Sequence, residues 1–411
     1  MRRRTIRHET LHLTRRRFLV GLGGGIVTAV AAACGIPLRS PAPSDAASPS
    51  ASPLPTPMAS PGIRTTLRDK IGQMLLVGFR GLTVQESASV VADIREHALG
   101  GILLFDYDTP TASPIRNIAS PEQLFALVSG LQAAASTPLI VAVDEEGGRV
   151  ARLDERHGFP PTVSAREMGE RGDLAFTRQE AARMARTLHS AGINLNLAPV
   201  VDLDVNPLNP IIGALRRSFS ADPAVVAVQA GAFIDAHHEV GVACTLKHFP
   251  GHGSSTGDTH LGVVDVTTTW SEIELDPFRR LMAGGSVDAI LTAHVFNSTL
   301  DPDYPATLSR ATITGILRDR LGYDGLVLSD DMQMGAIRDE FGYEDAVRLA
   351  INAGVDILTI ANQQLFEDGI VGRTIDLVER MVGDGQISGE RIDASYRRIQ
   401  AFKAGLAPSL G

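Results

Sequence analysis

The chain has 411 residues, of which 44% are hydrophobic and 21% are charged, and its formal net charge is −9. This composition is that of an ordinary globular protein with one large domain or two smaller ones. The negative charge disfavours a nucleic acid as a partner. Of the two cysteines, Cys244 lies in an apolar run and is expected to be a small buried side chain.

Residues 1–33 predict an export signal. They hold seven arginines and one glutamate, and the run Thr14–Val20 (TRRRFLV) precedes an apolar, Gly-rich and Ala-rich segment. This looks like a twin-arginine signal, and the segment is short for a membrane span, which needs ~20 apolar residues. Ala31–Gly35 (AAACG) resembles a bacterial lipobox and predicts lipidation of Cys34. Cleavage near Ala33 with release is the alternative.

Residues 34–62 are rich in Pro, Ser and Ala, a composition that cannot bury a core and predicts an extended tether. A signal, a lipid anchor and a spacer together predict a lipoprotein at the outer face of the cytoplasmic membrane, or else a secreted protein. The catalytic domain is expected over residues 63–411.

Eight short apolar runs follow in the order of the chain. They are continuous rather than alternating, which is typical of parallel strands buried on both faces. The runs are Met74–Val77, Gly101–Phe105, Leu139–Val143, Ile193–Leu197, Val242–Leu246, Ala289–Thr292, Leu326–Leu328 and Ile357–Ile360.

Amphipathic helical stretches separate these runs, and several of them end at a glycine, as helix C-caps do. The stretches are Pro121–Ala134, Thr177–Ala191, Pro223–Val240, Glu272–Ala283, Ser309–Leu321 and Tyr343–Ala353, with a longer tract over Ile375–Leu406 that is interrupted near Gly383–Gly389. The alternation predicts an α/β fold, a single (β/α)8 TIM-type barrel. A doubly wound open sheet is the alternative, but no Gly-x-Gly-x-x-Gly turn follows the first strand.

Ionisable residues come directly after five successive predicted strands. They include Asp144, Asp202, Lys247, His294 and Asp330. The carboxyl ends of barrel strands open at one mouth, where barrel enzymes place their active sites. We therefore expect these side chains to converge on a single site.

The stretch Lys247–His260 (KHFPGHGSSTGDTH) is the richest of these, with three histidines, a lysine and an aspartate. One interpretation is a metal site that activates water, built from His248, His252, Asp258, His260 and His294. Pro250 and the neighbouring glycines disfavour the helix that the His-x3-His spacing would need. The other interpretation is a carboxylate that attacks a sugar while a separate acid protonates the leaving oxygen.

At this point the sequence resembles glycoside hydrolase family 3, and within it the bacterial β-N-acetylglucosaminidase branch. The motifs extend over nearly all of the chain from Leu67 onward and stand in family order. They are Asp144–Arg152 (DEEGGRVAR), Ala198–Asp202 (APVVD), Arg217–Phe219 (RSF), Lys247–Gly253 (KHFPGHG), Asp258–His260 (DTH), Thr292–His294 (TAH), Pro305–Ser309 (PATLS) and Ser329–Met332 (SDDM).

The resemblance implies a role for each site residue. Asp330 would be the nucleophile, and His260 would be the general acid/base, oriented by Asp258. The residues that would bind the sugar hydroxyls are Asp144, Arg152, Arg217, Lys247 and His248. The cations Arg217 and Lys247 are expected to hold the pKa of Asp330 down. No metal or organic cofactor is implied.

Two features depart from the family pattern. Ser254 and Ser255 stand where the family usually has Asp-Thr, and the segment Gly213–Arg217 is longer than usual, which leaves Arg216 and Arg217 both as candidates for the binding arginine. We expect Phe249–Gly257 to be a flexible carrier that brings the Asp258–His260 pair over the sugar.

The sequence thus predicts a retaining exo-β-N-acetylglucosaminidase that removes terminal GlcNAc from cell-wall-derived glycans through a covalent glycosyl–Asp330 intermediate. A β-glycoside phosphorylase or a β-glucosidase of the same family is the alternative. A metal-dependent hydrolase on the same barrel and a non-catalytic sugar-binding lipoprotein are further alternatives.

Overall fold

The computed structural model describes residues 65–406. The predicted export signal, the tether and Cys34 lie outside the described residues. Within residues 65–406, no helix combines the length and the apolar character that crossing a membrane requires.

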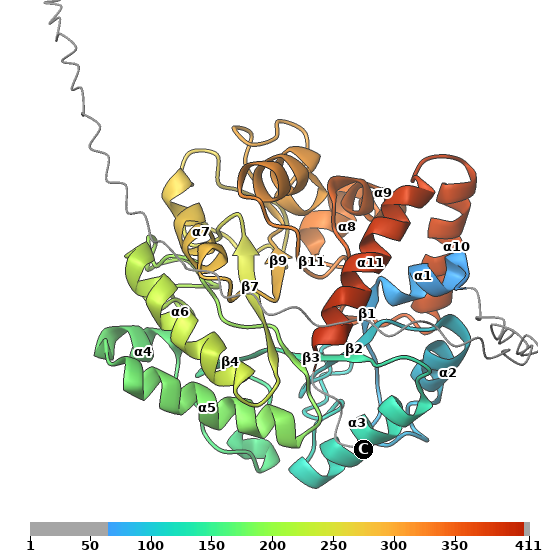
Figure 1. Ribbon diagram of the computed structural model, residues 1–411, viewed down its shortest axis with the longest axis horizontal. Coiled ribbons are helices and arrows are strands. Elements are labelled where there is room, and N and C mark those ends of the chain that lie inside the picture. The colour runs from blue at the N-terminus through green and yellow to red at the C-terminus, as the bar shows by residue number, and fades with distance from the viewer. Residues whose placement is uncertain (1–64, 407–411) are drawn as a thin grey trace, which may run out of the picture. The chain divides into compact units, whose positions relative to one another are not determined.

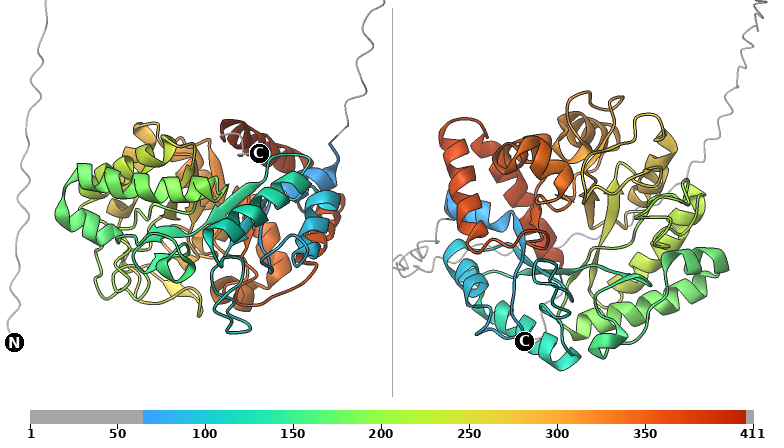
Figure 2. Two further views of the ribbon diagram at one scale, coloured as in Figure 1. Left: turned by 90° about the horizontal axis from the view of Figure 1, so that it is seen from below. Right: turned by 180° about the vertical axis from the view of Figure 1, so that it is seen from behind.

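The fold is the predicted (β/α)8 barrel, with strands at the centre and helices around them (Figures 1 and 2). Eight parallel strands pair in the order β11-β9-β7-β6-β3-β2-β1-β12. Their bounds are β1 Leu75–Gly78, β2 Gly101–Leu104, β3 Ile140–Val143, β6 Leu195–Asn196, β7 Ala243–Phe249, β9 Ala289–Thr292, β11 Leu326–Leu328 and β12 Leu358–Ile360. All eight expected apolar runs are therefore strands, because burial on both faces requires continuous apolar sequence.

Side chains as well as the main chain close the barrel between β11 and β12. Leu328 pairs with Ile357 as an isolated parallel bridge. Beyond it, the backbone N–H of Thr359 donates to Oγ of Ser329 and that of Ala361 donates to Oδ1 of Asp331, each at 2.9 Å. We call these contacts the closing seam, and it includes the residues on both sides of Asp330.

The helices form the outer layer. The α-helices are α1 Leu67–Gln73, α2 Ala88–His97, α3 Pro121–Ala134, α4 Ala165–Arg171, α5 Leu174–Ser190, α6 Pro223–His238, α7 Asp276–Ala283, α8 Gly335–Phe341, α9 Tyr343–Ala353, α10 Ile370–Gly383 and α11 Gly389–Gly405. Within residues 65–406, the short 3-10 helices are η1 Glu155–His157, η2 Glu272–Leu275 and η3 Ala306–Leu308, and η4 Ala311–Arg320 is π-helical. Although α1 and α11 are far apart in sequence, they lie side by side (Figure 1), and Lys70 of α1 pairs with Asp393 of α11 at 2.6 Å.

Two expectations about the elements need correction. The stretch Glu272–Ala283 is not one helix, because a 3-10 turn gives way to α7 at Asp276-Pro277. The strand expected to end at Leu246 runs on to Phe249, since Phe249 pairs with Thr292 after a register shift. The first residues of the His-rich stretch are therefore strand residues with fixed side-chain directions.

Short additional strands line the carboxyl ends of the barrel strands. β4 Glu145–Gly147 and β5 Val150–Ala151 form an antiparallel hairpin directly after β3. Its turn requires glycine, because Gly148 has φ +63° and a Cβ there would lie 2.7 Å from Cβ of Ser164. β8 Val264–Asp265 pairs in parallel with β10 Val295–Phe296, which follows β9.

Apolar packing fixes the strand that leads into the site. Phe249 at the end of β7 is fully buried and meets Phe278 of α7 edge to face, with ring centroids 5.3 Å apart. Cys244 in the same strand is 2% exposed, as expected for a small apolar side chain. Because these contacts hold both the strand and its helix, β7 has one position from which to present the residues that follow.

Candidate active site

A pocket of about 480 Å³ opens at the carboxyl ends of the barrel strands. All eight residues predicted for the site line it: Asp144, Arg152, Arg217, Lys247, His248, Asp258, His260 and Asp330. The convergence expected from the strand ends is therefore observed. The chemical role of each side chain stays a prediction.

Glu146 is the organising carboxylate of the pocket, and the sequence interpretation did not select it. It forms a bidentate pair with Arg217, through two contacts of 2.7 Å, and its Oε1 also lies 2.6 Å from Nζ of Lys247. Lys247 in turn donates to Asp144 at 2.6 Å. Burial opposes ionisation of Glu146, but the two cations outweigh it and hold its pKa well below the usual range.

The neighbouring Glu145 has the opposite environment. It is buried, and its Oε2 accepts the backbone N–H groups of Arg152 and Leu153, each at 2.9 Å. Burial raises the pKa of Glu145 to about 8. Alternate residues of the β4 hairpin point to opposite faces, so Glu146 faces the cations of the pocket while Glu145 supports the turn that presents Arg152.

Arg152 reaches the pocket between two carboxylates. Its guanidinium lies 3.6 Å from Asp106 and 3.9 Å from Asp144. Asp106 is also paired with Arg156 at 3.0 Å. Neither contact of Arg152 is a close hydrogen bond, so its donors are available to a ligand.

His248 is oriented by a buried carboxylate. Its Nδ1 lies 2.6 Å from Oδ2 of Asp202, which also accepts the backbone N–H of His252 at 2.7 Å through Oδ1. Burial opposes ionisation of Asp202, but His248 and His252 outweigh it and lower its pKa. A cis peptide bond joins Lys247 to His248. Asp202 thus anchors this loop through backbone hydrogen bonds from His248 and His252.

Asp330 and Asp331 divide two tasks at the end of β11. Oδ1 of Asp331 accepts the backbone N–H groups of Gln333 at 3.1 Å and Ala361 at 2.9 Å. Burial raises the pKa of Asp331 to about 6. Asp331 therefore holds the backbone, and Asp330 is left to face the pocket.

The side chains that lower the pKa of Asp330 are histidines. Burial opposes ionisation, but His294, His248 and His260 outweigh it and lower the pKa of Asp330. The expectation that Arg217 and Lys247 would do this was wrong, because both cations are committed to Glu146. The predicted direction is right and the predicted cause is not.

The histidines of the site do not form a metal centre. Nε2 of His294 donates to the carbonyl oxygen of Asp331 at 2.9 Å and its Nδ1 contacts Oγ1 of Thr307 at 2.8 Å. His248 and His260 each pair with a different aspartate. Over residues 65–406, no group of three or more His, Cys, Asp or Glu side chains is arranged to hold a metal ion.

Asp258 and His260 form a pair at the rim of the pocket. Oδ1 of Asp258 accepts both the backbone N–H of His260 at 2.9 Å and its Nδ1–H at 2.7 Å. The His260 side chain is 55% exposed. The contact with Asp258 assigns the Nδ1–H tautomer, so Nε2 is the ring nitrogen that can exchange a proton with a ligand.

The expected flexible carrier is in fact largely fixed. Residues 249–255 are buried, and Nδ2 of Asn209 donates to the carbonyl oxygens of His252 at 2.7 Å and Gly253 at 3.1 Å. A side chain at Gly253 would lie 1.9 Å from the carbonyl oxygen of Leu203. The glycines therefore permit close backbone packing rather than motion, and the exposed part of the loop begins at Thr256.

The geometry separates the two candidate arginines. Arg217 points into the pocket with a side chain only 12% exposed, whereas Arg216 is 42% exposed and pairs with Glu170 at 3.2 Å. Arg149 is also outside the pocket lining and donates to the carbonyl oxygen of Ala214 at 3.1 Å. Of the two arginines in the segment Gly213–Arg217, Arg217 is therefore the one that lines the pocket.

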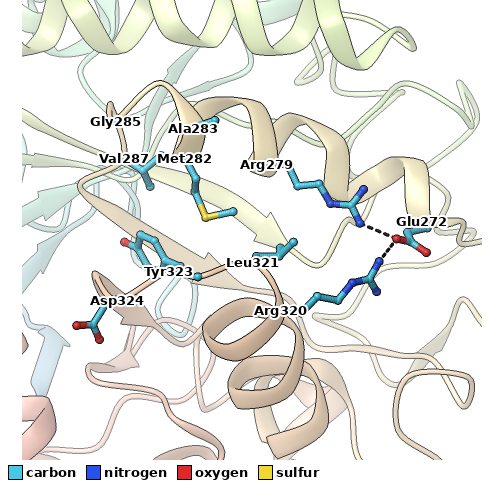
Figure 3. A pocket seen from close by; sticks show the side chains of 11 residues that line it. Glu272, Arg279, Met282, Ala283, Gly285, Val287, Arg320, Leu321, Tyr323 and Asp324 are labelled. Atoms are coloured by element: carbon cyan, nitrogen blue, oxygen red, sulfur yellow. Dashed lines mark hydrogen bonds and ion pairs between the residues drawn. The ribbon is translucent and has the colours of Figure 1, made fainter. Parts of the chain in front are cut away.

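A second hollow, of about 690 Å³, lies between α7 and the π-helical η4, away from these residues. Figure 3 shows Arg279 and Arg320 both directed toward Glu272. Both arginines are thus engaged in exposed ion pairs, which contribute little and leave few groups to bind a ligand. The chemistry of this chain therefore lies in the smaller pocket.

Barrels of this kind carry their chemistry at the carboxyl ends of the strands. Here that end presents an ionised aspartate and charged donors suited to a hydroxyl-rich ligand. The class of protein that this defines is a (β/α)8-barrel glycoside hydrolase. Comparison with known families then gives the family: residues 66–402 match the glycosyl hydrolase family 3 N-terminal domain, and the chain belongs to that family.

Individual relatives are consistent with this family assignment. A β-hexosaminidase of Tolumonas auensis is 40% identical over 326 residues, which are 75% of this chain and 92% of the relative. A family 3 β-N-acetylglucosaminidase from Paenibacillus sp. FPU-7 has a TM-score of 0.75 at 35% identity, covering 84% of this chain and 65% of that one. A β-N-acetylhexosaminidase from Beutenbergia cavernae has a TM-score of 0.74 at 29% identity, covering 82% and 98%. The predicted family, barrel and hydrolase class are confirmed.

Proposed function

We propose that this protein is a retaining exo-β-N-acetylglucosaminidase that removes terminal GlcNAc from cell-wall-derived glycans. The observation that carries the proposal is that one pocket holds an ionised Asp330 and an aspartate-paired His260. The names of the relatives support GlcNAc as the sugar.

In the first step, the Asp330 carboxylate attacks the anomeric carbon and the bond to the leaving oxygen breaks. Protonated His260 donates its Nε2–H to that oxygen, because Nδ1–H is already held by Asp258 at 2.7 Å. The lowered pKa of Asp330 suits a nucleophile that must be ionised.

In the second step, water attacks the covalent glycosyl–Asp330 ester. His260 is now neutral and accepts the proton of that water at Nε2, which returns the histidine to its starting form. Two displacements on the same carbon retain its configuration. Asp258 remains hydrogen-bonded to Nδ1 in both steps and stabilises the imidazolium each time it forms.

The other charged residues bind the sugar. Lys247 pairs with both Asp144 and Glu146, and Glu146 pairs with Arg217, so these side chains form one network of short contacts and are fixed before the ligand arrives. The pocket is closed beneath by Leu103, Leu197 and Leu291 from the barrel interior. A pocket closed at its base suits a terminal sugar and supports exo action.

The cellular location proposed here rests on the sequence of residues 1–62. A twin-arginine signal, the lipobox around Cys34 and a Pro/Ser-rich tether support a lipoprotein at the outer face of the cytoplasmic membrane. Metabolic labelling with a fatty acid tests this: the wild-type chain incorporates label, and a Cys34→Ala variant does not.

Kinetics on an aryl β-N-acetylglucosaminide test the activity. Asp330→Ala is expected to lose turnover by at least about a thousandfold, because the nucleophile is absent. An Asp330→Ala protein with wild-type turnover would refute the proposal. Repeating the assay with inorganic phosphate separates hydrolysis from phosphorolysis, since a phosphorylase would release the sugar 1-phosphate.

A further inference from the structure

Glu274 is a buried carboxylate beneath the loop that carries His260. It belongs to η2, does not line the pocket and is 1% exposed. Its Oε2 accepts the backbone N–H groups of Gly253 at 3.0 Å and Ser254 at 3.3 Å. Its Oε1 has no hydrogen-bond partner among the described residues.

The backbone of the loop is fitted closely around this side chain. Gly251 has φ +121°, and a Cβ at this position would lie 2.6 Å from Cβ of Glu274. The indole Nε1–H of Trp270, four residues before Glu274, donates to the carbonyl oxygen of Pro250 at 3.1 Å. The segment between β8 and α7 thus holds the loop over Pro250–Ser254.

Burying the carboxyl of Glu274 at this position costs free energy of desolvation. It forms no ion pair within residues 65–406, and burial, with a further contribution from Asp202, raises its pKa to about 7. An apolar side chain of similar size would fill the space without that penalty. The feature that an apolar side chain would not reproduce is the acceptor for two backbone N–H groups.

The shortest of the contacts that hold the loop lie at its base. At its base, the contacts to Asp202 and Asn209 are 2.7 Å, and Glu274 accepts from Gly253 at 3.0 Å and from Ser254 at the longer distance of 3.3 Å. At its tip, the carbonyl oxygens of Thr259 and His260 accept from the first turn of α8 and from Gln364 at 3.3–3.4 Å. The tip contacts are long, so the base sets the direction in which the loop leaves the barrel.

We propose that Glu274 is a positioning residue for the general acid/base, which fixes the base of the loop so that the Asp258–His260 pair lies over the sugar. The inference rests on the proposed glycosidase function and adds to it a residue that touches neither substrate nor His260.

The chemistry of the leaving group provides a specific measurement. A phenolate leaving group needs protonation by His260, whereas a dinitrophenolate leaves without it. Likewise, azide attacks the glycosyl–enzyme without the help of a general base. A displaced His260 therefore slows phenyl β-N-acetylglucosaminide much more than the dinitrophenyl analogue, and azide partly restores turnover of the latter.

The experiment compares the wild-type protein with Glu274→Ala, Glu274→Gln and the control Asp301→Ala. Asp301 is also a buried carboxylate whose oxygen accepts two backbone N–H groups, from Asp303 at 2.9 Å and Tyr304 at 3.1 Å, but it does not line the pocket. For Glu274→Ala, kcat/KM on the phenyl substrate is expected to fall about 10- to 100-fold, part of the usual general-acid contribution, with a change of less than about threefold on the dinitrophenyl substrate. Inhibition by GlcNAc should stay unchanged.

Glu274→Gln keeps an acceptor and is expected to restore most of the phenyl activity, while Asp301→Ala lowers Tm and leaves the ratio of the two substrates as in wild type. An unchanged ratio in Glu274→Ala would overturn the inference, as would an equal loss on both substrates. If Glu274→Ala does not fold, Glu274→Asp, which shortens the reach of the carboxyl, takes its place under the same criteria. A wild-type protein inactive on both substrates would instead refute the proposed function.

Discussion

Oδ2 of Asp202 lies 2.6 Å from Nδ1 of His248, and Asp202 is fully buried. This contact assigns the Nδ1–H tautomer to His248. The other ring nitrogen, Nε2, lies 3.3 Å from Nη2 of Arg217 and can accept from it. One buried carboxylate therefore decides how two of the predicted sugar-binding side chains face each other.

Asp202→Asn is expected to disturb this relationship without removing the loop anchor. The amide oxygen can still accept the N–H of His252, but the amide NH2 opposes Nδ1 of His248 and favours the Nε2–H tautomer, which then faces a donor of Arg217. We expect kcat/KM to fall about tenfold or more, as in other enzymes where a carboxylate fixes an imidazole tautomer. Asp204→Asn is the control, because Asp204 pairs with Arg166 outside the pocket lining. Equal kinetics for both variants would contradict the interpretation.

Arg217→Lys is expected to weaken both binding and folding. The bidentate contact with Glu146 needs the planar guanidinium, and lysine offers a single point charge in its place. We expect KM to rise and the free energy of unfolding to fall by about 1.5–3 kcal/mol, the range for a hydrogen bond to a charged group. Urea denaturation measures the second effect. The neighbouring Arg216→Lys is a matched control, since its exposed pair with Glu170 should make a change too small to resolve.

Glu145→Gln is expected to change how stability depends on pH. The folded-state pKa of Glu145 is about 8, against an ordinary value of 4.5. Between these values the folded state holds more protons than the unfolded state, so stability falls as pH rises through this window. Glutamine keeps the acceptor for the N–H groups of Arg152 and Leu153 but does not ionise. The advantage of the variant should therefore grow from pH 5 to pH 8, by up to about 1.4 kcal/mol for each pKa unit. A constant difference in denaturation midpoint would exclude this account.

For Lys403 the dependence of stability on pH has the opposite sign to that for Glu145. Lys403 lies on α11, is 6% exposed, and its Nζ donates to Oε1 of Gln73 at 2.8 Å. Burial lowers its pKa from 10.5 to about 7. Between these values the unfolded state holds more protons, so stability rises with pH.

Lys403→Met removes this buried charge and is expected to raise Tm most at pH 7 and below, with an advantage that shrinks toward pH 10. Thermal denaturation across this range measures it. Lys70→Met, which removes the partly exposed pair with Asp393, should show no such trend. A Lys403→Met advantage that does not change with pH would mean that lost packing, rather than charge, sets the effect.

The sequence was sufficient for the barrel because parallel strands buried on both faces must be continuously apolar. The same rule failed where polar residues continue a strand. The apolar run predicts a strand that ends at Leu246, yet β7 continues to Phe249, since neighbouring strands pair with the backbone regardless of the side chain. The backbone pairing that extends β7 leaves no trace in local composition.

The types of residue in the sequence were enough to identify the side chains that line the pocket. Which side chains pair with one another depends on tertiary contacts. Glu145 and Glu146 are adjacent and chemically identical, and only the turn of the hairpin gives one a pKa of about 8 and the other two cations. The glycines after β7 predicted flexibility, whereas they allow the backbone to approach Leu203 and Glu274. A Gly-rich sequence is compatible with a flexible loop and with a closely packed one. The carboxylates that hold this loop in place, Asp202 and Glu274, lie elsewhere in the chain.

The closing seam also affects the position of Asp330, because it involves the residues on either side of it. The side chain of Ser329 accepts the backbone N–H of Thr359 in β12, and that of Asp331 accepts the N–H of Ala361, which directly follows β12. The contacts that close the barrel therefore involve the residues on either side of Asp330. Local opening of the closing seam would move Asp330 while the other strands stayed paired. We expect the amides of Thr359 and Ala361 to exchange with deuterium before those of β2 and β3. Enzymatic activity should be lost at urea concentrations that leave the helical circular dichroism signal intact. Activity would then report whether the closing seam between β11 and β12 is formed.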